Sequence, residues 1–329
     1  MIQQTVARLL PLAGAKQFWI ITNDDLRPEI LRQVPKLRKD QIVAEPIGRN
    51  TAPAIGLATF ILQRTDPDAI IGLFPSDHVI ENPDRFRETV SEAIEIATSG
   101  ENIVVLGIEP TRAETGYGYI EAGSLASGNA RHVKRFTEKP NAERAAEFLR
   151  SGNFYWNSGM FLWSARTLAN ALAEHLPKTA SVLEKIAVDF GTKKFASTFR
   201  RLYPKCENIS VDYALLEPRS AKGEQASNIF CLRADFGWND LGSWTALHEH
   251  HAAKATAPDG NLISGQGIFT LNATGNYIHA PRKFVAVVGV KDVVVVEADD
   301  ALLVTNRENS QDVGKVVKYL DEKKMAKLV

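Results

Sequence analysis

Hydrophobic positions in the first third of the chain form short continuous runs that alternate with helical patterns. The runs have strand length and lie at residues 17–22, 42–44, 69–74 and 102–108. Apolar positions with helical spacing lie at residues 2–10, 26–34, 52–63 and 83–98. Strands separated by amphipathic helices predict a Rossmann-like α/β fold, with a mostly parallel sheet and helices on both faces.

The pattern changes twice further along the chain. Strands are predicted at residues 117–122, 132–137 and 154–163, and helices at 141–151, 165–176, 178–190 and 192–202. Beyond about residue 250, turn residues separate short β-rich runs at 267–271, 277–279, 284–288, 293–296 and 302–304, before a last helix at 312–320. We therefore predict a large α/β domain over 1–250 and a small β domain over 251–329.

Composition narrows the class of protein. The 329 residues include 39 Lys and Arg and 39 Asp and Glu, so the formal net charge is zero and no basic footprint for nucleic acid is present. No apolar run reaches the roughly 18 residues that span a bilayer. Two cysteines make neither a disulfide framework nor a zinc site. We expect a cytoplasmic protein with no nucleic-acid or membrane partner. An enzyme, a binding module and a regulatory subunit all remain open.

One polar segment lies between a predicted strand end and a helix start, and it contains Glu45, Gly48, Arg49, Asn50 and Thr51. Backbone amides at a helix N-terminus bind anions, and Asn and Glu side chains suit the edges of a purine base. The segment is thus a candidate nucleotide site. The alternative is a capping loop, with Thr51 at the N-cap and Pro53 in the first turn.

Two aspartates are candidates for holding a metal ion. Asp77 follows the end of the buried run 69–74, where ligands bind in open α/β sheets. Asp240 lies in a segment rich in glycine and tryptophan at 236–244. Carboxylates in such places hold Mg²⁺ together with phosphates. The alternatives are a turn residue at Asp77 and a helix cap at Asp240. His78 is expected to be a structural partner.

Three further positions could contact a ligand. Gly118 permits close approach of the backbone, Lys139 is a point charge suited to a phosphate, and Asn157 and Ser158 need hydrogen-bond partners inside an aromatic run. Each has an ordinary alternative: a tight turn for the glycine, solvent for the lysine, and neighbouring backbone for Asn157 and Ser158.

The joint order of these segments is more specific than any one of them. The chain resembles the sugar-phosphate nucleotidyltransferase family, and within it the bacterial mannose-1-phosphate guanylyltransferases, through EPIGRNTAPAIGLA at 45–58, FPSDHVI at 74–80, PTRAETGYGYI at 110–120, FTEKP at 136–140, YWNSGMF at 155–161, SVDYALLE at 210–217 and GWNDLGSW at 237–244. The resemblance implies that GTP and mannose 1-phosphate give GDP-mannose and pyrophosphate, a reaction that depends on positioning and charge neutralisation.

The resemblance also implies a role for each candidate residue. Asp77 and Asp240 would hold Mg²⁺ and, with Lys139, form the catalytic set. The nucleotide would meet Glu45, Gly48, Arg49, Asn50, Thr51 and Asp77, and the sugar phosphate would meet Gly118, Glu138, Lys139 and Asn157. The C-terminal domain would be a short left-handed β-helix. The oligomeric state stays open, a homodimer included.

One feature of the family is missing from the sequence. The family opens with a strand and a glycine-rich loop, bearing Arg and a nearby Lys, that cradles the triphosphate, whereas Met1–Thr5 matches the helix after that loop. The missing portion has the scale of one βα unit, about 30 residues. We favour an active enzyme whose start lies upstream, because Asp77, Lys139 and Asp240 are retained. The alternatives are an inactive sugar-nucleotide-binding or regulatory homologue and a related hexose-1-phosphate nucleotidyltransferase.

Overall fold

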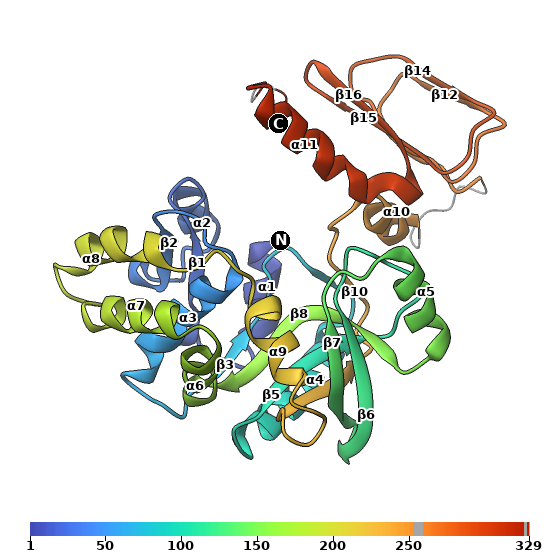
Figure 1. Cartoon of the computed structure of the whole chain (residues 1–329). Helices are drawn as coiled ribbons and strands as arrows, with labels where there is room; N and C mark the ends of the chain where they lie inside the picture. The colour runs from blue at the N-terminus through green and yellow to red at the C-terminus, as the bar shows by residue number, and fades with distance from the viewer. Residues whose placement is uncertain (253–258, 326–327, 329) are drawn as a thin grey trace. The chain divides into compact units, whose positions relative to one another are not determined.

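The chain forms two compact units in the computed structural model, Met1–Trp238 and Asn239–Val329 (Figure 1). The structure describes residues 1–252, 259–325 and 328. Among these residues, no helix is long and apolar enough to cross a membrane. The predicted domain boundary at residue 250 lies inside helix α10 (Trp244–Ala252), which belongs to the second unit. Where the functional domains divide therefore stays a prediction.

A six-stranded sheet with the order β3-β8-β5-β9-β7-β6 is the centre of the first unit. Its strands are β3 (Ile70–Leu73), β5 (Ile103–Ile108), β6 (Tyr119–Ser127), β7 (Ala130–Thr137), β8 (Phe154–Ser164) and β9 (Ile229–Ala234). The start of β6 also pairs with the start of β8, so β5, β6, β7, β8 and β9 close a ring of strand pairings.

The α/β class is confirmed, but the prediction of a mostly parallel sheet is wrong. Within the six-stranded sheet only β5 and β9 pair in parallel, and the other described pairings are antiparallel. One reason is local: Gly128 and Asn129 form a two-residue connection between β6 and β7, which makes an antiparallel hairpin (Figure 1). Gly128 has φ of +54°, as such turns require. The run that forms β9 was not predicted as a strand.

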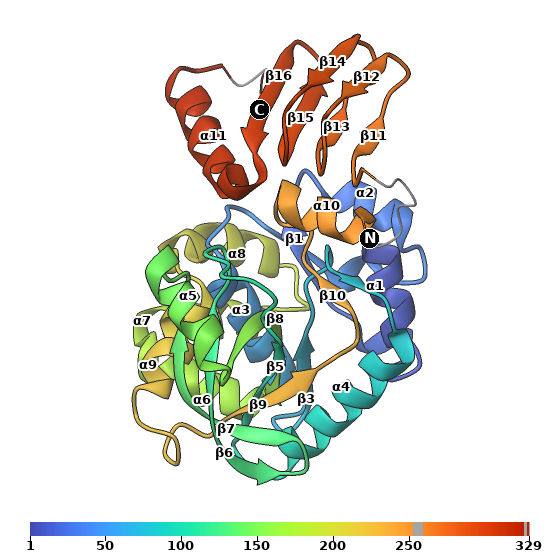
Figure 2. The same cartoon turned by 90° about the vertical axis from the view of Figure 1, so that its right-hand side faces the viewer.

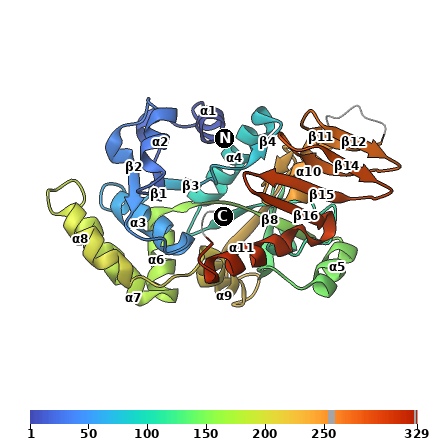
Figure 3. The same cartoon turned by 90° about the horizontal axis from the view of Figure 1, so that it is seen from above.

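Helices cover both faces of the sheet, as predicted. On β5, Ile103 and Val105 pack into the cluster formed with α3 (Thr51–Gln63), α6 (Ala165–His175) and α7 (Pro177–Val188). Val104 and Leu106 point the other way and join the cluster of α4 (Pro83–Thr98). Figures 2 and 3 show α4 on one side of the sheet and α6 on the other. This alternation explains why β5 is apolar at every position.

The remaining elements of the first unit flank this core. A separate parallel pair consists of β1 (Ile20–Asn23) and β2 (Ile42–Glu45). The other elements are α1 (Ile2–Leu9), α2 (Arg27–Gln33), β4 (Val79–Ile80), α5 (Ala142–Ser151), α8 (Phe195–Leu202), the π-helical turn η4 (Asp212–Leu216) and α9 (Glu217–Ser220), with short 3₁₀ turns η1 (Ala15–Gln17), η2 (Lys39–Gln41) and η3 (Tyr203–Lys205). Strand β10 (Trp238–Asn239) lies where the two units meet in the sequence.

Short strands stacked in parallel form the second unit (Figure 2). One stack contains β11 (Leu262–Ser264), β13 (Tyr277–His279) and β15 (Val293–Ala298), and a second contains β12 (Ile268–Leu271) and β14 (Val285–Val288). Antiparallel β16 (Ala301–Asn306), the turn η5 (Arg307–Asp312) and α11 (Val313–Glu322) follow. The expectation of a coil of short strands, in place of another βαβ layer, is confirmed. Its left-handedness stays a prediction.

Buried polar side chains stabilise the turns of this coil. Asn276 Nδ2 donates to Asn261 Oδ1 at 2.8 Å, and Asn276 Oδ1 accepts from Val293 N at 2.9 Å, so the amides link successive turns. Glu297 is buried and accepts hydrogen bonds from the backbone N–H groups of Arg282 and Lys283. These hydrogen bonds satisfy buried polar groups, each of which would reduce the stability of the fold if it had no partner.

Candidate active site

The candidate nucleotide segment leads from β2 into α3. The structure places the N-cap at Asn50, whose Oδ1 accepts from Thr51 N at 2.8 Å, so the alternative that Thr51 is the cap is wrong. Asn50 has φ of +64° and ψ of −170°, a region that side chains rarely occupy. Such strain is concentrated at functional sites in proteins. Gly48 and Asn50 are exposed, so both can meet a ligand.

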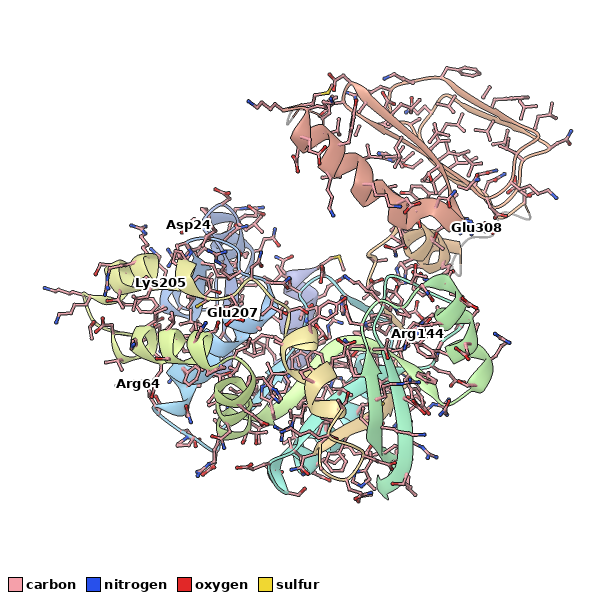
Figure 4. The ribbon with its side chains drawn as sticks, in the orientation of Figure 1. Asp24, Arg64, Arg144, Lys205, Glu207 and Glu308 are labelled. Carbon is pink, nitrogen blue, oxygen red and sulfur yellow. The ribbon has the colours of Figure 1, made fainter. Side chains whose placement is uncertain are left out.

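Glu45 and Arg49 are held by the segment that follows α8. The Tyr203 hydroxyl donates to Glu45 Oε1, and Arg49 Nη2 donates to the Pro204 carbonyl at 2.5 Å. Burial raises the pKa of Glu45 against the opposing effect of the Tyr203 bond. Lys205 and Glu207, labelled in Figure 4, lie exposed on the same segment. Nothing in the sequence pattern indicated Tyr203, although it is fully buried.

Asp77 lies on the loop after β3, as predicted. Its side chain is 76 % exposed, and its Oδ1 lies 3.9 Å from His78 Nε2. Helix α1 holds the loop: Arg8 Nη2 donates to the His78 carbonyl at 2.9 Å. His78 Nδ1 accepts from Trp238 Nε1 at 3.1 Å, which confirms its expected structural role. The carboxylate of Asp77 is therefore presented to solvent by a fixed loop.

Asp240 belongs to the second unit, while Asp77 belongs to the first. Gly242 lets the chain pass beside the Asp240 carboxylate, since a Cβ at Gly242 would lie 2.4 Å from Asp240 Oδ2. Among the described residues, no three His, Cys, Asp or Glu side chains gather into a metal-binding cluster. The pairing of Asp77 with Asp240 on one ion stays a prediction.

Asn157 lies at an irregularity of β8. The register with β5 shifts between Val105 and Gly107, so residues 158–160 bulge opposite a single β5 residue. Gly159 has φ of +69°, which explains the glycine in the sequence NSG. Asn157 Oδ1 accepts from Gly159 N at 3.0 Å, and Ser158 Oγ donates to the Leu106 carbonyl at 2.7 Å. Neighbouring backbone thus satisfies Ser158, the alternative kept open for it.

Three of the predicted sugar-phosphate residues come together at this bulge. Asn157 N donates to the Gly118 carbonyl at 2.8 Å, and a Cβ at Gly118 would lie 2.4 Å from Glu138 Oε2. The Glu138 side chain is 11 % exposed, and its Oε2 has no hydrogen-bond partner among the described residues. Lys139 is 60 % exposed, with Nζ 4.0 Å from Glu138 Oε1. Lys139 also has a strained φ of +44°.

Acidic neighbours change the titration of this cluster. Burial, followed by the negative charge of Asp212, raises the pKa of Glu138 to about 7, although Lys139 opposes the shift. Burial also raises the pKa of Asp212, whose Oδ1 accepts from Asn157 Nδ2 at 2.9 Å. Asp212 lies within SVDYALLE, and the sequence predicts no role for it. Its bond with Asn157 joins residues 55 positions apart, so no local pattern indicates it.

Comparison with known proteins identifies the family. A model of the family described as nucleotidyl transferase matches residues 1–257, and one described as a MannoseP isomerase/GMP-like beta-helix domain matches residues 268–320. This chain belongs to the nucleotidyl transferase family. The second match agrees with the stacked strands of the second unit, so this nucleotidyltransferase also has a β-helix-like domain.

Relatives and solved structures extend the similarity over nearly the whole nucleotidyltransferase chain. It is 37% identical to mannose-1-phosphate guanylyltransferases from Escherichia coli and from Salmonella typhimurium, over 98% and 97% of its length. It spans about two thirds of those relatives, 67% and 65% of their lengths. A crystal structure described as mannose-1-phosphate geranyltransferase from Thermus thermophilus superimposes with a TM-score of 0.80 at 29% identity, covering 97% of this chain and 89% of that one.

Proposed function

We propose that the chain is a mannose-1-phosphate guanylyltransferase. A phosphate oxygen of mannose 1-phosphate attacks the α-phosphorus of GTP and forms a new P–O bond. The bond from that phosphorus to the bridging oxygen breaks, and pyrophosphate leaves with the electron pair. The nucleophile is already ionised, so the residues have to position two anions and neutralise their charge. The proposal names GTP and mannose 1-phosphate because the relatives cited above carry that enzyme name.

The grouping of Gly118, Glu138 and Asn157 at the β8 bulge carries this proposal. The three residues come from different strands or their ends, and beside Gly118 they leave a carboxyl oxygen of Glu138 that has no partner in the described part of the chain. A sugar supplies hydroxyl groups that can pair with such an oxygen. Lys139, exposed at the rim, is the cation suited to the sugar phosphate.

The nucleotide is assigned to the segment that leads into α3. Asn50 and Thr51 lie at the N-terminal end of that helix, where the helix dipole and amide groups favour an anion. Glu45 and Arg49 would face guanine and ribose, with Gly48 allowing close approach. Tyr203 fixes the Glu45 carboxylate, so the acceptor atoms for a base are held in place before binding.

Asp77 and Asp240 are proposed to hold Mg²⁺. The residues suit the ion, because Mg²⁺ in nucleotide sites takes one or two carboxylates together with substrate phosphates, and Asp77 is open to solvent. When bound, the ion neutralises negative charge on the phosphates.

We also propose that the chain works in the cytoplasm. Both described cysteines, Cys206 and Cys231, are free and buried, which suits a protein of a reducing compartment.

The test is a turnover assay with GTP, mannose 1-phosphate and Mg²⁺, following GDP-mannose by chromatography and pyrophosphate by a coupled assay. Glucose 1-phosphate and other nucleoside triphosphates form the comparison panel. A preference for another pair would indicate a related hexose-1-phosphate nucleotidyltransferase. The assay is run on the 329-residue chain and on a form carrying a family glycine-rich loop before Met1. If both forms are inactive but bind GDP-mannose, the chain is an inactive homologue that binds the sugar nucleotide, and the proposed activity is wrong.

We expect Asp77→Ala and Asp240→Ala each to reduce Mg²⁺-dependent turnover of the active form by at least a hundredfold, because each removes a metal carboxylate. Lys139→Ala is expected to raise KM for mannose 1-phosphate about tenfold, the loss of one charged contact. Lys178→Ala removes an exposed lysine on α7 and is the matched control. Unchanged turnover in both aspartate variants would refute the metal assignment.

A further inference from the structure

The segment 209–217 contacts both proposed substrate subsites. At its start, Ala52 N donates to the Ile209 carbonyl at 3.2 Å, and Val211 N donates to Thr51 Oγ1 at 2.9 Å. These two bonds attach the segment to the first turn of α3. The π-helical turn η4 begins at the very next residue, and π-helical turns occur often at functional sites.

The same segment reaches the sugar subsite through two carboxylates. Asp212 Oδ1 accepts from Asn157 Nδ2 at 2.9 Å, and Glu217 Oε1 accepts from Glu138 N at 3.3 Å. Asp212 is the first residue of η4, and Glu217 follows its last residue. Both carboxylates therefore have their positions set by a segment that is anchored at its other end to α3.

The bond to Asp212 fixes the orientation of the Asn157 amide. Gly159 N already donates to Asn157 Oδ1 at 3.0 Å, so with Asp212 opposite, the two ends of the amide are both constrained. One N–H and one lone pair of the amide remain for a ligand. Without Asp212, the side chain could rotate about its last bond and lose this direction.

We propose that Asp212 is a positioning residue of the sugar-phosphate subsite: it holds the Asn157 amide beside Gly118 and Glu138, so that the remaining N–H and lone pair of that amide meet the sugar hydroxyls. This inference rests on the proposed function, and Asp212 lies outside the catalytic, nucleotide-binding and sugar-phosphate-binding residues given above. Asp212 itself does not touch the reacting atoms.

The charge of Asp212 provides a second readout. The charges that act on Glu138 are those of Asp212, Lys139 and Glu217, and Tyr213 is a titratable neighbour on which Glu138 itself acts. Removing the Asp212 charge lowers the pKa of Glu138, since a neighbouring negative charge disfavours a second one. A protonated Glu138 donates a hydrogen bond, so mannose 1-phosphate should bind more weakly as pH rises through about 7 in the wild type, and from a lower pH in the variants.

The experiment compares steady-state kinetics of the wild type, Asp212→Ala, Asp212→Asn and Asp189→Ala across pH 5.5–8.5. Asp212→Ala is expected to raise KM for mannose 1-phosphate about tenfold, with kcat and KM for GTP changed less than threefold. Asp212→Asn keeps an acceptor oxygen for Asn157, so its KM at pH 6 should return to within threefold of the wild type. The pH profile of Asp212→Asn should nevertheless remain shifted to lower pH, because this variant also lacks the negative charge at residue 212. Asp189→Ala removes an acceptor for Thr198 elsewhere in the unit and should change none of these values.

The outcomes separate the two proposals. The wild type here is the active form of the turnover assay, and absence of turnover in both the 329-residue chain and the form with the loop overturns the proposed function and this inference together. An active wild type with an Asp212→Ala variant of unchanged KM overturns the inference alone. Equal increases in both KM values without recovery in Asp212→Asn show a structural role only and also overturn it. If Asp212→Ala fails to fold by thermal melting, Asp212→Asn decides through its pH profile, where an unshifted profile contradicts the inference.

Discussion

Gly118 sets how closely a ligand can approach the pair of Glu138 and Asn157. A Cβ at this position would lie 2.4 Å from Glu138 Oε2 and 3.3 Å from the Asn157 Cβ. The carboxyl group would have to move, while the strand that carries Asn157 has little room to do so. Only glycine at position 118 therefore leaves the space beside Glu138 and Asn157 open for a ligand.

Gly118→Ala is expected to raise KM for mannose 1-phosphate at least tenfold and to lower the free energy of unfolding by about 1–3 kcal/mol, the usual cost of overpacking. Steady-state kinetics and urea unfolding measure the two effects. Gly14→Ala serves as the control, because a Cβ there meets only Gln17 Oε1 at 3.7 Å and the φ of −67° suits alanine. Wild-type kinetics in Gly118→Ala would contradict the assigned position of the sugar.

Glu138 also makes stability depend on pH. Its pKa is raised to about 7 in the folded chain, so between about 4.5 and 7 the folded state binds more protons than the unfolded one. This group therefore lowers the free energy of unfolding as pH rises through that range. Glu138→Gln is expected to be about 2 kcal/mol more stable relative to the wild type at pH 8 than at pH 5. Urea unfolding at both values measures it, and an equal difference at the two would contradict the prediction.

At the scale of an element, the start of α3 combines capping with strain. Asn50 caps the helix with its side chain, yet its backbone lies at φ +64° and ψ −170°, where glycine is preferred. The strain costs about 1–3 kcal/mol, and replacing an Asn cap by glycine costs only a few tenths. A side chain is retained here against the preference of the backbone, as expected for a residue that serves a ligand.

Asn50→Gly is therefore expected to stabilise the chain by about 1 kcal/mol while lowering kcat/KM for GTP at least tenfold. Thermal melting and kinetics measure the two effects. Asn82→Gly is a control, because Asn82 also caps a helix with its side-chain oxygen, which accepts from Arg85 N at the start of α4, but has φ of −115°. It should lose a little stability and keep its activity. A destabilised Asn50→Gly variant would show that the strain is absent.

At the scale of the whole molecule, the two units should respond to acid in opposite ways. Burial alone would raise the pKa of Glu297 in the second unit, but hydrogen bonds from Lys283 and from the Arg282 and Lys283 backbone lower it to about 2. The stability that this group contributes is present above about pH 4.5 and is lost as pH falls toward 2. Acid therefore removes the cost of the buried Glu138 charge in the first unit, but it removes the stability that the Glu297 charge contributes to the second unit.

Glu297→Gln is expected to lower the melting temperature of the second unit at pH 7, because an amide cannot accept from all of these donors, and to change it little near pH 2. Calorimetry of the full chain at pH 2.5, 4.5 and 7 measures the effect, with Glu138→Gln as the comparison for the first unit. A constant difference between the variant and the wild type at all three values would contradict the assignment.

The sequence allowed most elements to be predicted, because each has its own local period. Helix α4 was predicted at its observed bounds, and strands β12 to β16 of the second unit within a few residues, whereas β11 was not predicted. The orientation of β8 was not accessible, since helices between early strands suggested a parallel sheet and pairing is a non-local property. Predicted site residues on one short motif, such as Asn157, could be named. Tyr203 and Asp212 could not, because their roles depend on contacts across the fold.

The π-helical turn after Val211 makes the length of its segment critical. Deleting one residue between Asp212 and Leu216 would let ordinary α-helical bonds replace the wider ones, so the fold could survive. Side chains before and after the deletion would then rotate relative to each other by about 100°, one residue of an α-helix. The two acids could then no longer both reach the sugar subsite, where Asp212 meets Asn157 and Glu217 meets Glu138 N. Among related chains, the residue count between these two acids thus separates sequences that can hold both acids there from those that retain only the architecture.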